Sequence, residues 1–322
     1  MLGAGGAVLV VGCGDGSGDA GDSSTGGVTS SGSGTTASSN SPTTSNGTSG
    51  GGTSTGEGTS TGEGTVSGDG SSTAAAGCDG VASSWASGGT AAMTAKDCYP
   101  DPFAGGVLEC ALICETTAGP CTADTIERQD VSEGFPGLPV RLALLVVDAD
   151  TCAPVPDAIV EIWHKQRTGV YSGVTPNPQM CYGQDPSAAN YLYFRGTQTA
   201  GADGRVDFDT CFPGWYSGRA IHIHFRVTRG GDEYVTSQLF FADDLITELF
   251  SSHSEYKEFG QPNTTNDSDN IIGGEADKSN YLLTTARMPD GAMLASKVIA
   301  IRSSPGDESC SVGGGGGMPS PP

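Results

Sequence analysis

Two of the four histidines of the chain, His222 and His224, fall in the tripeptide HIH within an apolar, β-branched run. Side chains alternate between the two faces of a strand, so both imidazoles would point to one side and Ile223 to the other. This spacing suits two ligands of one metal ion, but it also suits buried hydrogen-bonding histidines or a zinc site. His164 and His253 have no such partner and are interpreted as structural or surface residues.

The residues around the histidine pair form a longer pattern. The segment RGTQTAGADGRVDFDTCFPGWYSGRAIHIHFRV at 195–227 resembles the core of the intradiol ring-cleavage dioxygenases, above all their extracellular branch. Two upstream segments resemble the same family, PVPDAIVEIWHKQRTGVYSG at 154–173 and ERQDVSEGFPGLPVRLALLVVDADTCAPV at 127–155. Because three blocks match in order and with family-like spacing, the resemblance covers 110–301.

The resemblance implies a ferric ion, Fe(3+), bound by four side chains: Tyr171 of GVYSG, Tyr216 of PGWYSGR, His222 and His224. Iron(III) is a hard Lewis acid that favours anionic oxygen, and two phenolates would neutralise much of its charge. Without the flanking matches, both tyrosines would be interpreted as sandwich aromatics with hydroxyls at the surface. One tyrosinate would leave the metal and act as a base, and Tyr171 is assigned this catalytic role.

Two further residues match family positions near the metal. Arg219 stands three residues before His222, where a guanidinium would stabilise negative charge that develops on the substrate ring. Gln238 of TSQLFF matches a position from which an amide would hydrogen-bond near the metal. The alternatives are a salt bridge on a loop for Arg219 and an exposed strand residue for Gln238.

The activity that the resemblance implies is cleavage of a catechol-type diol by O2 between its two hydroxyl carbons, giving a cis,cis-muconate-type diacid. The identity of the diol stays open, because two segments depart from the family pattern. The sequence WHKQRTG places basic residues where an acidic one is common, and AGPCT at 118–122 replaces an EGPY-type segment. Residues 78–139 show no counterpart of the helical dimerisation region of the cytosolic branch, so the oligomeric state is open.

Two other classes of function compete with this interpretation. One is a non-catalytic secreted β-sandwich binding module that kept the scaffold, although loss of function would be expected to remove at least one of the four ligand types. The other is a zinc-dependent enzyme that uses the HIH pair, but no acidic residue with convincing spacing follows it.

The elements that would position these residues are strands. Short apolar and β-branched runs separated by turn clusters predict an all-β fold, a β-sandwich with long loops. The expected strands are 140–147, 158–163, 204–208, 221–227, 234–241 and 297–301. The run LITELF at 245–250 predicts one short helix, and the polar segment that follows it to Gly274 predicts a long surface loop.

The composition divides the chain. From 14 to 77 it is almost entirely Gly, Ser, Thr, Ala and Asn, and no Lys or Arg precedes Lys96. Such a stretch has few apolar side chains to bury, so we expect a disordered linker over 14–77, a domain over 78–304 and a disordered tail over 305–322. The formal net charge of −22 argues against a nucleic-acid partner, because phosphate binding needs a cationic surface.

Cysteine usage and the first residues indicate export. The ten cysteines include no CxxC pair, which favours disulfides formed in an oxidising compartment. The run MLGAGGAVLVVGC at 1–13 resembles a bacterial lipoprotein signal in which Cys13 carries the lipid anchor, although an ordinary apolar leader is the alternative. We therefore expect a protein anchored to a bacterial membrane, in the periplasm or at the cell surface, or otherwise extracellular. Nine cysteines remain after Cys13, so at least one would be free or paired between chains.

Overall fold

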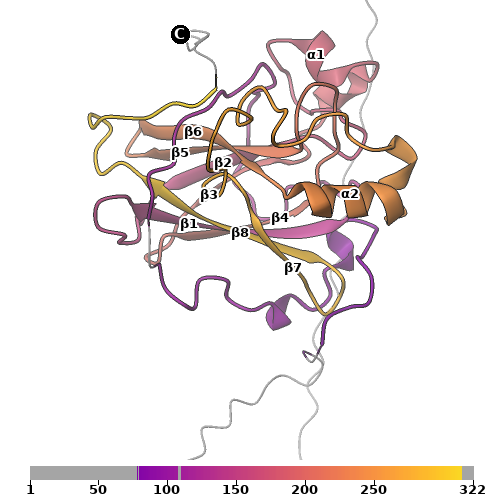
Figure 1. The fold of residues 1–322 in the computed structure, drawn as a ribbon, viewed down its shortest axis with the longest axis horizontal. Coiled ribbons are helices and arrows are strands. Elements are labelled where there is room, and N and C mark those ends of the chain that lie inside the picture. Colours follow the sequence, from indigo (N-terminus) through magenta and orange to yellow (C-terminus); the bar gives the residue numbers. More distant parts are fainter. Residues whose placement is uncertain (1–77, 79, 108–109, 314–322) are drawn as a thin grey trace, which may run out of the picture. The chain divides into compact units, whose positions relative to one another are not determined.

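The computed structural model describes residues 78, 80–107 and 110–313. The expected anchor at Cys13, the linker over 14–77 and residues 314–322 of the expected tail lie outside these described residues. The domain is a sandwich of two four-stranded sheets, with strand orders β4-β1-β8-β7 and β3-β2-β5-β6 (Figure 1). The all-β sandwich predicted from the sequence is confirmed.

The strands and helices follow one another in the chain as β1 (Pro139–Asp148), β2 (Ile159–Trp163), α1 (Pro178–Tyr182), β3 (Arg195–Thr199), β4 (Arg205–Cys211), β5 (His222–Arg229), β6 (Asp232–Phe240), α2 (Asp243–Ser252), β7 (Thr284–Arg287) and β8 (Met293–Ile301). Short 3-10 turns lie at Thr90–Ala92, Lys96–Cys98, Pro186–Asn190 and Lys257–Phe259.

Alternating apolar side chains build the core between the sheets. Leu142 and Leu144 of β1 face Ile162 of β2 and Ile223 and Phe225 of β5 within one buried cluster. Because residues of a strand alternate in direction, the neighbours of these core residues on β2 and β5 must point away from the core. The outer face of the β3-β2-β5-β6 sheet therefore carries polar and aromatic side chains that loops must cover.

The lead-in segment covers the outer face of the other sheet. Ala143 of β1 packs with Met93 and Leu294, whereas Leu145 and Val147 pack with Phe103. Strand β1 is therefore buried on both faces, which explains why its sequence is a nearly continuous apolar run.

Two strands and the end of the domain differ from the expectation. Strands β3 (RGTQT) and β7 (TTAR) were not predicted, because neither contains an apolar run and each lies at a sheet edge. The domain also extends past residue 304, and the expectation of a disordered tail is wrong for 305–313. A disulfide joins Cys310 to Cys114, and the Glu115 N–H donates to the Cys310 carbonyl at 2.8 Å. Helix α2 is the short helix that LITELF predicts.

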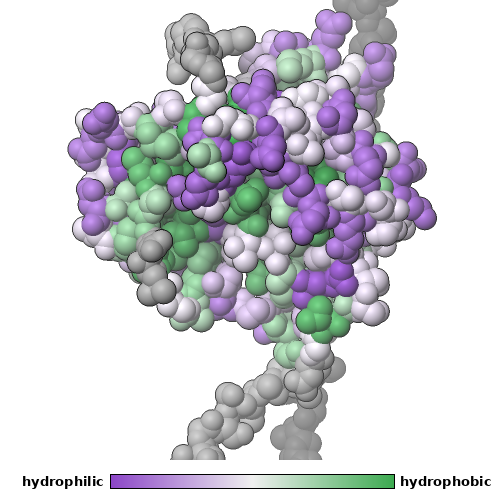
Figure 2. Space-filling model, in the orientation of Figure 1, coloured by the Kyte–Doolittle hydropathy of each residue, from purple (hydrophilic) through white to green (hydrophobic). Residues whose placement is uncertain are grey.

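Four disulfides join the cysteines of the domain: Cys78–Cys98, Cys110–Cys152, Cys114–Cys310 and Cys121–Cys181. Cys211 is free and buried among the described residues, in keeping with the expectation that one of the nine has no partner within the chain. Across the described residues no helix is long and apolar enough to cross a membrane. Hydrophilic and hydrophobic residues are interspersed over the face of the domain shown in Figure 2.

Candidate metal centre

The histidine pair begins β5 and points to the outer face of its sheet. Strand pairing places Trp163 on one side of His224 and Gln238 on the other. The Trp163 and His224 rings are stacked, with centroids 4.9 Å apart and planes 5° apart. Since Ile223 lies in the core, the alternation expected of HIH is confirmed. The stacked indole fixes the plane of the His224 imidazole.

The two imidazoles meet through their Nε2 atoms. His222 Nε2 lies 3.2 Å from His224 Nε2, and both residues are almost completely buried. His222 Nδ1 donates to the Ala220 carbonyl at 2.7 Å, which leaves a lone pair on Nε2. Two nitrogen ligands at neighbouring positions around one ion, each about 2.1 Å from it, are about 3 Å apart. The separation of the two Nε2 atoms is therefore that of two ligands of one ion.

Burial sets the charge of this pair. Burial lowers the pKa of both His222 and His224 well below the usual value, and the nearby Arg219 guanidinium lowers it further. Both imidazoles are neutral at physiological pH as a result. A neutral imidazole is the form that binds a metal ion. His224 Nδ1 is buried near the Thr117 carbonyl without a well-formed hydrogen bond.

Tyr171 lies in the loop that follows β2, and its backbone N–H donates to the Cys181 carbonyl at 2.9 Å. Its hydroxyl lies 3.5 Å from His222 Nε2, and its side chain is only 3% exposed. Burial is the largest cause that raises the pKa of Tyr171 well above its usual value, while Arg219 and Arg195 oppose the shift. The phenolate form of so enclosed a side chain requires a cation beside it.

Tyr216 lies on the segment between β4 and β5. Its ring is edge-on to that of His222, with centroids 6.1 Å apart, and its side chain is half-buried. Burial raises the pKa of Tyr216, whereas the Arg219 guanidinium beside its hydroxyl lowers it. Of the four expected ligands, Tyr216 is the one with access to solvent.

Two glycines let the loops that carry the tyrosines touch. A Cβ on Gly214 would lie 2.4 Å from the Arg167 carbonyl oxygen, and a Cβ on Gly169 would lie 2.5 Å from that of Trp215. Neither loop could approach the other so closely with a side chain at these positions. The motifs that end in Tyr171 and Tyr216 therefore meet backbone to backbone.

Arg219 is fixed by two partners. Its Nε forms a salt bridge with Asp269 Oδ2 at 2.9 Å, and its Nη2 donates to the Gln238 amide oxygen. The Gln238 amide nitrogen donates in turn to the Thr117 carbonyl at 2.8 Å. Gln238 is fully buried, so the alternative of an exposed strand residue is wrong. Asp269, which also accepts from the Ala220 N–H at 2.8 Å, belongs to the polar loop after α2 and carries no sequence signal.

The AGPCT segment forms one wall of the site. A Cβ on Gly119 would lie 3.3 Å from His224 Cε1, so the backbone here covers the imidazole directly. The Cys121–Cys181 disulfide ties this segment to α1. Arg195 lies behind Tyr171, and its Nε donates to the Ser172 carbonyl at 2.9 Å.

Lys165 also lies within the site. Its side chain is fully buried, and its Nζ lies 3.6 Å from the Tyr216 ring centroid. In the sequence it belongs to WHKQRTG, one of the two segments that depart from the family pattern.

The other two histidines have structural roles. His164 Nε2 hydrogen-bonds with Thr210 Oγ1 at 2.7 Å in the interior, and His253 Nε2 donates to the Ala86 carbonyl at 2.8 Å. In the part of the chain that the structure describes, no group of three or more His, Cys, Asp or Glu side chains is arranged to hold a metal ion. A zinc site built on HIH would thus lack a third ligand of these types, and the further donors close to the pair are tyrosine oxygens.

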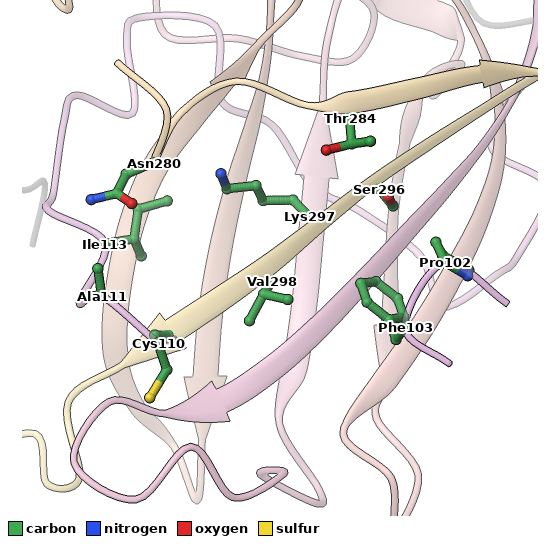
Figure 3. A pocket seen from close by; sticks show the side chains of 11 residues that line it. Pro102, Phe103, Cys110, Ala111, Ile113, Asn280, Thr284, Ser296, Lys297 and Val298 are labelled. Carbon is green, nitrogen blue, oxygen red and sulfur yellow. The ribbon is translucent and has the colours of Figure 1, made fainter. Parts of the chain in front are cut away.

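A separate hollow of about 280 Å³ lies over the other sheet, where Phe103, Thr284 and Lys297 line it (Figure 3). Strands β7 and β8 form its floor, and none of the expected ligands lines it. It is therefore distinct from the metal centre.

Comparison with known proteins gives relatives of one kind. The chain is 26% identical over 179 residues to catechol 1,2-dioxygenase 1 of Acinetobacter lwoffii, a match that covers 50% of this chain and 54% of that protein. It is 24% identical over 160 residues to chlorocatechol 1,2-dioxygenase of Rhodococcus opacus, covering 39% of this chain and 58% of the relative. The chain thus spans little more than half the length of these curated relatives. No protein-family model matches the chain.

Among solved structures, an intradiol ring-cleavage dioxygenase from Tetranychus urticae is similar, with a TM-score of 0.53 and 28% sequence identity. The match covers 62% of this chain and 98% of that one, so the shared part is nearly the whole of the mite protein. The sandwich, the ordered motifs and these relatives all point to the intradiol ring-cleavage dioxygenases as the family to which this chain is similar.

Proposed function

We propose that this protein is a non-haem iron(III) dioxygenase that cleaves catechol-type diols with O2 between the two hydroxyl carbons. One observation carries the proposal: His222 Nε2 lies 3.2 Å from His224 Nε2 and 3.5 Å from the Tyr171 hydroxyl. Three donors of the types that the family pattern implies thus converge on one point, and Tyr216 lies beside them.

The donor set suits a trivalent iron ion. Two neutral imidazoles and two phenol oxygens would hold it, and the bound ion would supply the positive charge that turns a catechol into a ligand reactive towards O2. Burial raises the pKa of Tyr171 and Tyr216, and a bound trivalent ion would oppose this effect by stabilising their phenolate forms.

The chain itself moves the substrate's proton. The sequence alone assigns the proton-accepting role to Tyr171. We place this role on the Tyr216 hydroxyl oxygen instead. Tyr216 is half-buried and has the Arg219 guanidinium beside it, whereas Tyr171 is enclosed and held through the Cys181 carbonyl. A hydroxyl proton of the incoming diol would pass to Tyr216, which can turn towards solvent.

Arg219 and Gln238 act through fixed geometry. Asp269 and Gln238 hold the Arg219 side chain in one orientation, so its guanidinium can stabilise negative charge on the substrate ring without first reorganising. Gln238 links Arg219 to the Thr117 carbonyl beside His224. We assign Gln238 as a positioning residue.

The expected product is a cis,cis-muconate-type diacid that contains both atoms of O2. The test is oxygen uptake by iron-loaded protein on a panel of catechols, together with the visible spectrum. A ferric–tyrosinate protein is coloured, whereas a zinc or metal-free protein is not. We expect Tyr216→Phe and His224→Ala to abolish oxygen uptake. Normal turnover in either variant would overturn the site assignment, and a colourless wild-type protein loaded with iron would favour the non-catalytic binding module.

We also propose that the protein is exported and held at a bacterial membrane by a lipid on Cys13. The four disulfides of the domain support export, because such bonds persist in oxidising compartments. Mass spectrometry of the membrane fraction would detect the acylated cysteine. An unmodified Cys13 in mature protein would refute the anchor and leave export standing.

A further inference from the structure

Lys165 places an amino group inside the candidate metal centre. It follows β2 by two residues, and strand-like alternation directs it to the same side as Trp163, which stacks on His224. Its side chain is completely buried, and its Nζ lies 3.6 Å from the Tyr216 ring centroid and 5.9 Å from that of Tyr171. The nitrogen therefore lies next to the rings of both proposed tyrosine ligands.

This nitrogen has no acceptor. Lys165 Nζ is buried without a hydrogen-bond partner, and no salt bridge among the described residues involves it. The Asp269 carboxylate already accepts hydrogen bonds from Arg219 Nε and from the Ala220 N–H. A buried donor left without a partner is costly to the fold. A ligand that brings an acceptor to Nζ would offset this cost.

The neighbouring groups leave Lys165 without a part in holding the diol. The diol oxygens would be met by the iron ion and by the Tyr216 oxygen, and the reacting carbon by Arg219. Arg195 is the other buried cation near Tyr171, but its Nε and Nη2 hold the carbonyls of Ser172 and Cys121. Arg195 Nη1 is also without a partner, but Lys165 is the one of these side chains that makes no hydrogen bond at all to the described part of the chain.

We propose that Lys165 Nζ binds a carboxylate carried on the ring of the diol, so that the site selects catechols bearing a further acidic group. This proposal rests on the proposed function. A carboxylate supplies the acceptor oxygens that Nζ lacks, together with a charge opposite to that of the nearby Arg195 and Arg219. A ring with only two hydroxyls would leave the nitrogen unpartnered.

The test measures binding without turnover. Iron-loaded protein is titrated without oxygen with 3,4-dihydroxybenzoate, with its uncharged methyl ester and with catechol, while the visible spectrum reports ligand binding. We expect the wild type to bind the carboxylate about tenfold more tightly than the ester. Lys165→Met should reduce that preference by about tenfold, to near parity, and leave catechol binding within about twofold of wild type, because one charge-assisted hydrogen bond is lost.

Two further variants guard against a structural explanation. Lys297→Met removes a partly buried lysine on β8 of the other sheet and should leave all three dissociation constants unchanged (Figure 3). Lys165→Gln keeps a nitrogen donor without charge and should retain part of the preference. We expect the thermal midpoint of Lys165→Met to equal or exceed that of wild type, since it replaces an unpartnered buried nitrogen with an apolar group of similar shape.

Each outcome decides the proposal. If catechol binds but the wild type shows no preference for the carboxylate, or Lys165→Met keeps that preference, the inference is wrong while the dioxygenase function stands. Equal weakening of catechol and carboxylate would place Lys165 on the diol and would also overturn it. Unfolding of both Lys165 variants would make the residue structural. If catechol itself does not bind the iron-loaded protein, the proposed function fails and this inference fails with it.

Discussion

Removal of the Cys121–Cys181 disulfide tests whether this bond orients the candidate ligands in addition to stabilising the fold. It joins the two segments that carry backbone contacts to the metal centre. Gly119 covers His224 from one segment, and the Cys181 carbonyl accepts from the Tyr171 N–H in the other. Replacing both cysteines with alanine should therefore loosen the candidate ligands as well as the fold.

The chain contains a matched control. Cys121 and Cys181 are 60 residues apart, whereas Cys110 and Cys152, which form a bond beside the other sheet, are 42 apart. Loop-closure entropy depends weakly on length, so loss of either bond should cost about 4 kcal/mol of unfolding free energy. Only the Cys121→Ala/Cys181→Ala pair should also weaken iron binding, by roughly 10- to 100-fold, because it frees groups that orient the ligands.

The assay combines two measurements on each double variant. Urea unfolding of iron-free protein gives the free energy of unfolding, and competition with a chelator, followed by the visible spectrum, gives iron affinity. Equal losses of iron affinity in the two variants would refute the reasoning, since the effect would then follow stability alone. Unchanged iron affinity in the Cys121→Ala/Cys181→Ala variant would show that the loops hold their positions without the bond.

Two further predictions concern buried polar groups. Asp269→Asn should lower kcat/KM for a diol roughly 10- to 100-fold, because Arg219 loses its carboxylate partner. The control Asp267→Asn changes a side chain that is 87% exposed in the same loop, and it should have no effect. Equal kinetics in the two variants would contradict the role of Asp269. Burial lowers the pKa of His164 to about 3, so this side chain stays neutral in the folded protein at pH 5. In the unfolded chain the same imidazole takes up a proton below about pH 6.5, so the free energy of unfolding falls as the pH falls. Urea unfolding of iron-free protein should show a His164 contribution of about 2 kcal/mol lost between pH 7 and pH 5, and a His164→Gln variant with the same pH dependence as wild type would refute it.

The sequence by itself determined the local features of this protein. Alternation within HIH fixes His222 and His224 on one side of a strand, because the direction of a side chain depends only on its place along the backbone. The apolar runs likewise determined six of the strands and the all-β class. With Cys13 set aside, the nine remaining cysteines cannot all pair within the chain, and the structure leaves Cys211 unpaired among its described residues.

The tertiary structure alone decided what meets across long separations in the chain. The approach of Tyr171 and Tyr216 depends on two loops that touch at Gly169 and Gly214. Asp269 reaches Arg219 from a polar loop 50 residues away, without any pattern that marks it. Strand register, loop packing and disulfide pairing set such contacts. None of these three can be read from the sequence that immediately flanks a residue. The lack of a partner for Lys165 likewise became visible only once every neighbouring acceptor had been placed.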